Sequence, residues 1–235
     1  MLYIRSFIYL LLQIILTPIF STLALLTFPF NPHTRYRIVS QWARLMLFLL
    51  RLVCNIRHEV LGLENIPAEP CIILCKHQSA WETLALQIIF PPQVWVLKRE
   101  LMWIPFFGWA LALTSPIAIK RSDGKGAVKQ LLKLGKVRLA HGFCVVIFPE
   151  GTRIQYGQRG KYKFGGALLA ASSGAPVVPV AHNAGRLWGR NAFFKHPGLI
   201  TMSIGAPIDT RNLKADEINA QVEAWIENEI TRLPH

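Results

Sequence analysis

A histidine and a carboxylate that follow an apolar segment form the most informative pair in the sequence. His77 lies two residues after residues 71–75, which read as a buried strand, and Glu82 lies five residues further on, in the first turn of a predicted helix. A carboxylate bonded to one ring nitrogen fixes the imidazole tautomer and stabilises the imidazolium, so the other nitrogen can take a proton from an alcohol. The pair therefore permits acyl transfer to a hydroxyl without a nucleophile from the protein.

A structural explanation of the same residues stays open. Ser79 and Glu82 also match a helix capping box, in which the carboxylate only bonds the backbone at the start of the helix. A single histidine at the end of a strand is more often structural than catalytic. The segment alone does not decide between a cap and a proton-transfer pair.

Two more polar clusters follow predicted strands. One is Phe148-Pro149-Glu150-Gly151-Thr152-Arg153, in which backbone amides at the glycine turn and a guanidinium can hold a phosphate. A polar turn with a surface arginine is the alternative. The other cluster is the cation pair Lys98 and Arg99. Ligands of α/β proteins bind where strands end at one edge of the sheet, so we expect the three clusters to lie together.

The elements that must position these residues alternate along the chain. Strands are predicted at residues 57–62, 71–75, 94–97, 115–119, 143–148, 177–181 and 199–204. Helices are predicted at residues 83–90, 126–140, 166–173 and 215–233. This order predicts an α/β fold with a mixed, largely parallel sheet flanked by helices.

The N-terminal segment predicts a membrane-embedded helix. Residues 6–34 contain no Asp, Glu, Lys or Arg, and residues 7–28 are almost entirely apolar. A helix rising about 1.5 Å per residue over this stretch is about 30 Å long, enough to cross the hydrocarbon core of a bilayer. The run is too long for a signal peptide and lacks a clear small-x-small cleavage site.

A second, interfacial helix is predicted after it. Five polar residues recur there at helical spacings: Arg37, Gln41, Arg44, Arg51 and Asn55. Apolar residues fill the remaining faces, which is typical of a helix lying at lipid headgroups. We therefore expect residues 1–56 to form a two-helix membrane anchor and residues 57–235 one catalytic domain. Two ordinary core helices are the alternative.

Composition narrows the class of partner. The chain has 235 residues with 26 Lys and Arg against 13 Asp and Glu, a formal net charge of +13, and 52% apolar residues. It is too apolar to be disordered, and its charge indicates an anionic partner. Nucleic acid is the generic candidate, but no recognition motif occurs.

The four cysteines lie in apolar runs without zinc spacing, which indicates a reducing, cytosolic-side protein without disulfides.

One predicted helix carries a row of cations. These are Lys125, Lys129, Lys133, Lys136 and Arg138, and the first three recur every fourth residue. A solvated helix face explains them simply. The sharper interpretation is a docking surface for anionic lipid, the phosphates of coenzyme A or an acidic carrier protein.

Four segments, in this order, resemble the sequence blocks of the glycerolipid acyltransferases. They are His77-x4-Glu82, Lys98-x2-Leu101 with Pro105 and Gly108, residues 148–153, and Val178-Pro179-Val180. The resemblance covers about residues 55–210, and the nearest match is with the bacterial 1-acyl-glycerol-3-phosphate acyltransferases. It departs in one place, because the first block of that family usually ends in Asp. A Glu there is also similar to acyltransferases that build lipid A, which are not expected to carry residues 150–153.

The resemblance implies a function and a set of site residues. His77 would deprotonate the acceptor hydroxyl with support from Glu82, and the alkoxide would attack acyl-CoA or acyl-carrier protein. The acceptor, 1-acyl-glycerol-3-phosphate, would be held by Lys98, Arg99, Glu150, Gly151, Thr152 and Arg153. The product would be phosphatidate, with another lysophospholipid or an amino-acid lipid as alternative acceptor and a non-catalytic lipid-binding protein as a third reading. We expect no cofactor or metal, no nucleic acid, and a membrane-bound protein facing the cytoplasm, at a bacterial inner membrane.

Overall fold

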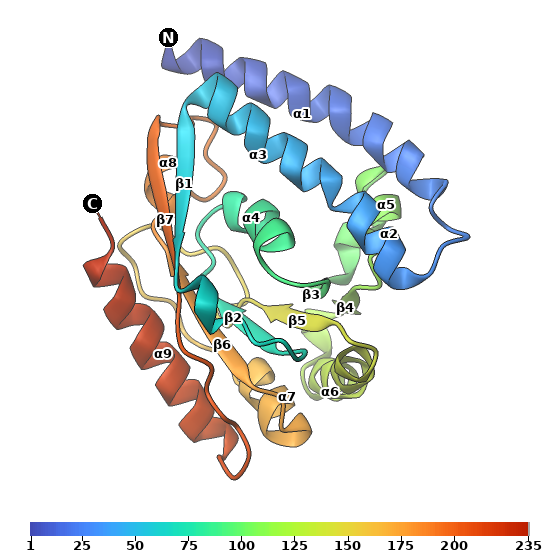
Figure 1. Cartoon of the computed structure of the whole chain (residues 1–235), viewed down its shortest axis with the longest axis vertical. Coiled ribbons are helices and arrows are strands. Elements are labelled where there is room, and N and C mark those ends of the chain that lie inside the picture. The colour runs from blue at the N-terminus through green and yellow to red at the C-terminus, as the bar shows by residue number, and fades with distance from the viewer. Residues whose placement is uncertain (235) are drawn as a thin grey trace.

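A computed structural model of the chain describes residues 1–234 and arranges its strands in one seven-stranded sheet (Figure 1). The strands are β1 (Ile56–Leu61), β2 (Ile72–Cys75), β3 (Gln93–Lys98), β4 (Ile117–Ile119), β5 (Cys144–Ile147), β6 (Val177–His182) and β7 (Gly198–Ile204). Their order across the sheet is β1-β7-β6-β2-β5-β3-β4. All neighbours are parallel except β6 and β7, so the sheet is mixed and largely parallel, as predicted.

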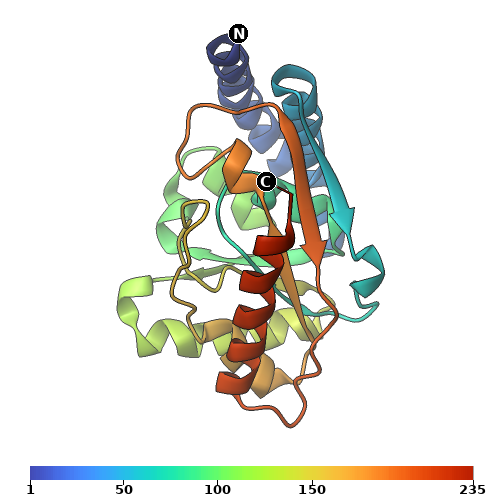
Figure 2. The same cartoon turned by 90° about the vertical axis from the view of Figure 1, so that its left-hand side faces the viewer.

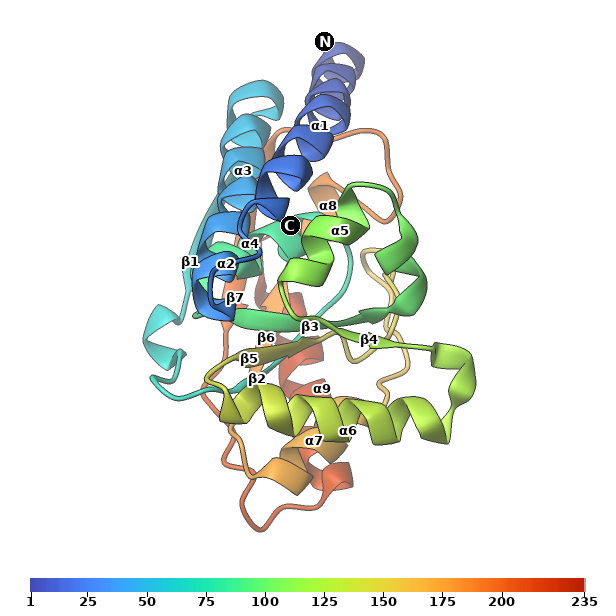
Figure 3. The same ribbon diagram turned by 90° about the vertical axis from the view of Figure 1, so that its right-hand side faces the viewer.

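Helices cover both faces of this sheet. They are α1 (Leu2–Leu25), α2 (Pro32–Val39), α3 (Gln41–Cys54), α4 (Trp81–Ile89), α5 (Phe107–Leu113), α6 (Lys125–Ala140), α7 (Gly165–Ser173), α8 (Ala184–Leu187) and α9 (Ala215–Arg232). Short 3-10 helices are η1 (Leu63–Asn65), η2 (Arg99–Trp103) and η3 (Arg121–Asp123). Figures 1 and 3 show α1 to α5 on one side of the central strands, and α6, α7 and α9 on the other.

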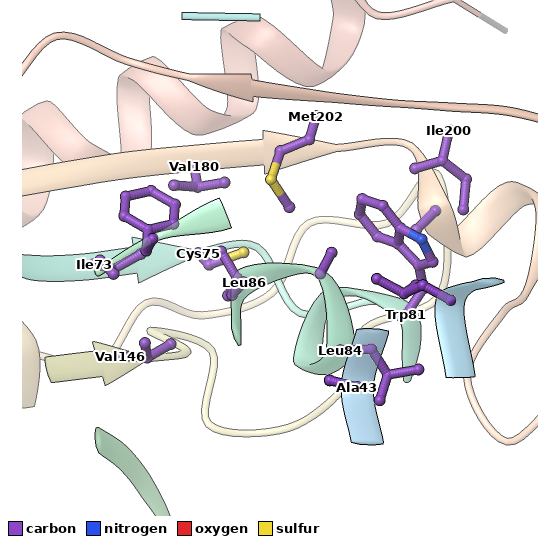
Figure 4. Packing of buried hydrophobic residues seen from close by; sticks show 14 of the residues in the cluster. Ala43, Ile73, Cys75, Trp81, Leu84, Leu86, Val146, Val180, Ile200 and Met202 are labelled. Atoms are coloured by element: carbon purple, nitrogen blue, oxygen red, sulfur yellow. The ribbon is translucent and has the colours of Figure 1, made fainter. Parts of the chain in front are cut away.

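The alternation of side chains along the central strands divides the core in two. In β2, Ile73 and Cys75 face the cluster shared with α3 and α4, whereas Ile72 and Leu74 face the cluster shared with α6, α7 and α9. Successive residues of a strand point to opposite faces, so a strand buried on both sides is apolar throughout. Figure 4 shows the first cluster, where Trp81 of α4 packs among side chains of the sheet.

The two-helix anchor is not confirmed, because α3 belongs to the core. Met46, Leu50 and Cys54 of α3 are buried in the cluster with the sheet, and Arg44 and Arg51 lie on its exposed side. The basic stripe is therefore the outer face of a helix whose inner face packs on α4. Residues 1–56 consequently share their packing with the α/β region.

Only α1 is long and apolar enough to cross a membrane among the described residues. Seventeen per cent of its most apolar window is buried, so most of this surface faces outward. Pro32 begins α2, where Asn31 Oδ1 accepts the amide of Thr34 at 2.9 Å. Proline suits a first helical position because its missing N–H would have no partner there.

Candidate active site

The predicted polar clusters meet at one edge of the sheet. Strands β6, β2, β5 and β3 are neighbours and parallel, so their carboxyl ends lie side by side. His77 follows β2, Glu150 follows β5, Lys98 ends β3 and His182 ends β6. The expectation that three strand-end clusters share one edge is confirmed, and His182 adds a fourth.

His77 and Glu82 form a hydrogen-bonded pair. The Nδ1 of His77 lies 2.7 Å from Glu82 Oε1. The same oxygen accepts the backbone amides of Gln78 at 3.1 Å and Ser79 at 3.0 Å. One carboxylate oxygen therefore bonds both the histidine ring and the backbone just before α4, whose N-cap residue is Ala80. Donation from Nδ1 leaves Nε2 as the nitrogen that can accept a proton.

The Glu82 carboxylate is held in its charged form although it is fully buried. Burial acts to raise the pKa of Glu82, but the neighbouring His182, the hydrogen bond from His77 and the Ser79 amide together hold this pKa below its usual value. His182 is also buried, and burial lowers its pKa, against the attraction of Glu82. It lies 3.8 Å from Glu82 Oε2 and bonds the carbonyl of Lys76 at 2.9 Å.

The imidazole of His77 lies in an aromatic stack beside a cavity. Its ring is 3.8 Å from that of Phe148 with 10° between the planes, and Phe148 stacks in turn on Trp95. The His77 side chain is 14% exposed, whereas that of Glu82 is inaccessible. A substrate can therefore reach the base but not the carboxylate behind it.

The cavity has a volume of about 550 Å³ and is mainly apolar. Its walls come from α1, the start of α3, α5 and β3, with residues such as Phe20, Trp42, Leu97 and Leu111. His77, Lys98, Arg121 and Arg153 are the charged or titratable side chains that line it. A long apolar space with cations beside a base suits a lipid with an anionic head.

The predicted substrate residues separate into different positions. Lys98 and Arg153 line the cavity, and Arg153 Nε is buried with no hydrogen-bond partner in residues 1–234. Arg99 and Thr152 are exposed and do not line it. Gly151 has φ +70° and lines a smaller neighbouring cavity of about 200 Å³ with Lys163, whose ammonium an added Cβ would meet at 2.7 Å.

Glu150 is not among the residues that line the cavity, and the expectation that it holds the acceptor stays a prediction. Its side chain is buried, with Oε1 2.9 Å from Lys76 Nζ and Oε2 accepting the His77 amide at 2.8 Å. Burial raises the pKa of this carboxyl, against the attraction of Lys76. A carboxylate would also repel a phosphate, so Glu150 fits a role in holding the His77 loop.

Sequence reasoning missed several residues around the site. Arg121 lines the cavity, but it lies at the start of η3, which no pattern predicted. Phe148 was named only as part of its block, and Lys76 and His182 had no role. The ends of β6 and β2 did carry a signal, since His182 and Lys76 are polar residues adjoining buried apolar runs.

Comparisons with known proteins identify the family of the chain. The family model described as Acyltransferase matches residues 57–183. A 1-acyl-sn-glycerol-3-phosphate acyltransferase of Pseudomonas aeruginosa is 50% identical over 88% of this chain and 83% of its own length. A protein of the same name from Saccharomyces cerevisiae is 31% identical over 79% of this chain and 63% of its own length. The chain belongs to the acyltransferase family.

The fold has a solved counterpart. The crystal structure of a 1-acyl-sn-glycerophosphate (LPA) acyltransferase from Thermotoga maritima superposes with a TM-score of 0.80, covering 97% of this chain and 94% of that one at 19% identity. This likeness supports the overall fold of the chain. The predicted α/β fold and the predicted family are both confirmed.

Proposed function

We propose that this acyltransferase moves a fatty acyl group from a thioester to the free hydroxyl of 1-acyl-glycerol-3-phosphate, forming phosphatidate. The observation that carries the proposal is the His77–Glu82 pair at the wall of an apolar cavity that also holds Arg153 and Lys98. The names of the relatives support the same acceptor.

The reaction follows from the position of the base. His77 Nε2 takes the proton of the acceptor hydroxyl, and the oxygen attacks the thioester carbonyl. The imidazolium is stabilised by Glu82, which is charged and 2.7 Å from Nδ1. Collapse of the tetrahedral intermediate breaks the carbon–sulfur bond, and the thiolate takes the proton back from His77. The acyl group thus ends on the acceptor oxygen and the proton on the thiol, and His77 returns to its neutral state.

The acceptor phosphate belongs beside the cations of the cavity. Arg153 and Arg121 are bidentate donors, and Lys98 adds a third positive charge with only an exposed partner, Glu100, at 3.6 Å. The apolar walls formed by α1 and α5 suit a fatty chain. Arg99 and Thr152 would act, if at all, outside this cavity.

The basic face of α6 fits the donor. Its lysines at positions 125, 129, 133 and 136 are exposed and form no ion pair with a described residue. Figure 3 shows α6 on the side of the sheet away from α1, so a membrane held by α1 does not reach it. This favours a soluble anionic donor, coenzyme A or an acidic carrier protein, over anionic lipid.

Membrane attachment through α1 completes the proposal. The helix is apolar, mostly exposed and continuous with the cavity wall, so lipid substrates can enter from the bilayer. The site would then face the cytoplasm at a bacterial inner membrane, where the thioester donors are found.

The test is an assay of the purified protein that crosses acceptors with donors. Lysophosphatidate, lysophosphatidylethanolamine and an ornithine lyso-lipid are each offered with acyl-CoA and with acyl-carrier protein, and the products are identified by mass spectrometry. Phosphatidate formation at a rate at least tenfold above the other products is expected. Turnover of another acceptor alone would reassign the acceptor, and no thioester turnover at all would favour a lipid-binding protein.

A further inference from the structure

A fully buried lysine lies directly before His77, and the proposed reaction gives it no part. Lys76 is 0% exposed, and its ammonium lies 2.9 Å from Glu150 Oε1 and 2.7 Å from Glu227 Oε1. A buried charge is costly unless it is paired, and an apolar side chain would fill the same space at lower cost. The arrangement therefore calls for an explanation other than stability.

Glu227 brings a distant part of the chain to this lysine. It lies on α9, beyond residues 57–183 that the family model matches. Its Oε1 also accepts the hydroxyl of Tyr162 at 2.8 Å, and Lys76 Nζ lies 5.9 Å from the centre of that ring. Figure 2 shows α9 packed across the sheet, so this carboxylate joins α9 to the loop after β2 and to the loop before α7.

The peptide groups around His77 are fixed by the same network. The Lys76 amide donates to Val180 O at 3.0 Å, and the Lys76 carbonyl accepts from His182. The next amide, that of His77, donates to Glu150, the second partner of the Lys76 ammonium. A change in the position of this ammonium therefore acts on Glu150 and, through it, on the backbone of His77.

We infer that Glu227 is a positioning residue for His77, acting through Lys76 and Glu150. The ammonium shared by two carboxylates keeps Glu150 oriented toward the His77 amide, while Glu82 orients the ring of the same residue. Carboxylates thus hold the loop in two ways. Glu150 and Glu227 fix its backbone through Lys76 and the His77 amide, and Glu82 fixes the imidazole. The kinetic part of this inference rests on the proposed function, whereas the structural part does not.

The experiment compares two carboxylates of α9. Glu227→Gln removes the charge with little change in size, and Glu223→Gln is the matched control, since Glu223 pairs with the exposed Arg159. We expect Glu227→Gln to lower kcat by about 10- to 100-fold with both KM values within about twofold, because a small misplacement of the base mainly affects the chemical step. Glu223→Gln should stay within about twofold of the wild type.

A double variant separates positioning through Lys76 from an independent effect. If Glu227 acts through Lys76, then Lys76→Met with Glu227→Gln should be no slower than Lys76→Met alone. The inference would be overturned if the fold-loss in kcat of the double variant equalled the product of the losses of the two single variants. A kcat of Glu227→Gln within about twofold of the wild type would overturn it as well. If Glu227→Gln does not fold, Tyr162→Phe decides: the inference expects a lower kcat at unchanged KM, and an unchanged kcat refutes it.

Hydrogen exchange tests the same inference without catalysis. Peptides containing residues 76–80 should exchange faster in Glu227→Gln than in the wild type and in Glu223→Gln. Equal exchange in all three proteins would refute the positioning role. A wild-type protein that makes no phosphatidate would refute the proposed function and leave this comparison intact.

Discussion

At the scale of single residues, Glu82 combines two contacts that the sequence presented as alternatives. One oxygen accepts hydrogen bonds from the ring of His77 and from two backbone amides, so the contact to the backbone and the contact to the proposed base are made by the same atom. The effect of a substitution at this position must therefore be measured on both the free energy of unfolding and kcat. The two effects separate because backbone amides need only an acceptor, whereas an imidazolium needs a charge.

Glu82→Gln is predicted to fold and to lose most of its activity. An amide oxygen can still cap the backbone, so the stability loss should be about 1 kcal/mol. Loss of the anion removes stabilisation of the imidazolium, and the analogous change in a serine-protease triad suggests a fall in kcat of up to about 10⁴-fold. The measurement is kcat for phosphatidate formation beside thermal unfolding.

Two further variants control this prediction. Glu82→Asp keeps the charge with a shorter reach and should retain more activity than Glu82→Gln. His77→Ala should be at least as slow as Glu82→Gln, and the double variant hardly slower, since the two act as one unit. If Glu82→Gln turns over at nearly the wild-type rate while His77→Ala is inactive, the role of Glu82 is limited to bonding the backbone.

Arg153→Ala is predicted to weaken acceptor binding. The guanidinium lines the cavity with Nε unpaired within the described residues, which leaves it available to an anion. A contact made in both ground and transition states changes KM more than kcat, so KM for lysophosphatidate should rise about tenfold or more. Arg57→Ala on β1, an outermost strand that three strands separate from β5, is the control. An unchanged KM in Arg153→Ala would place the phosphate elsewhere.

At the scale of elements, the strands were predictable because burial on both faces makes them continuously apolar. The runs at residues 71–75 and 177–181 needed no alternation to be recognised. Polar residues placed just after such runs also predicted the edge where the site lies. The sequence could not show that Lys76 and Glu227 meet, because that contact joins residues 151 positions apart.

Helix α3 shows what the sequence pattern left open. A basic stripe with apolar flanks is expected both of an interfacial helix and of a core helix with an exposed face. The burial of Met46 and Leu50 shows that the apolar face packs inward. Short elements such as α5 escaped prediction because seven residues give too little periodicity to recognise.

Helix α5 has a testable function as a wall of the cavity. Ala110 lines the cavity opposite residues of α1, so Ala110→Trp should fill part of it. We expect kcat/KM for a shorter acyl chain, relative to that for a longer one, to rise by about tenfold. A methylene that no longer fits the cavity loses about 0.8 kcal/mol of burial, and two methylenes lose about twice that. Val137→Trp, on the exposed side of α6, is the control. An unchanged chain-length profile would place the fatty chain outside this cavity.

At the scale of the whole molecule, two opposite surfaces carry different properties. One side presents the apolar exterior of α1, and the other presents the lysines of α6. Under the proposed function, a lipid substrate and a soluble donor would approach from different directions and meet at His77.

The last prediction concerns how α1 holds the protein on a membrane. Five apolar residues form one outward stripe of this helix: Ile4, Ile8, Leu11, Ile15 and Ile19, each at least 42% exposed. Deleting residues 1–56 would remove α3 from the core, so loss of binding would be confused with unfolding. Replacing Leu11, Ile15 and Ile19 with Gln leaves the buried face of α1 intact.

We expect this variant to dissociate from vesicles in a sedimentation assay at 1 M salt, with an unchanged Tm. The wild type should stay bound, because apolar attachment is not screened by salt. A matched triple change of the exposed Leu63, Val137 and Leu199 to Gln should stay bound. If the α1 variant remains on vesicles at high salt, another apolar surface, such as Trp103 and Trp109 beside the cavity, must carry the attachment.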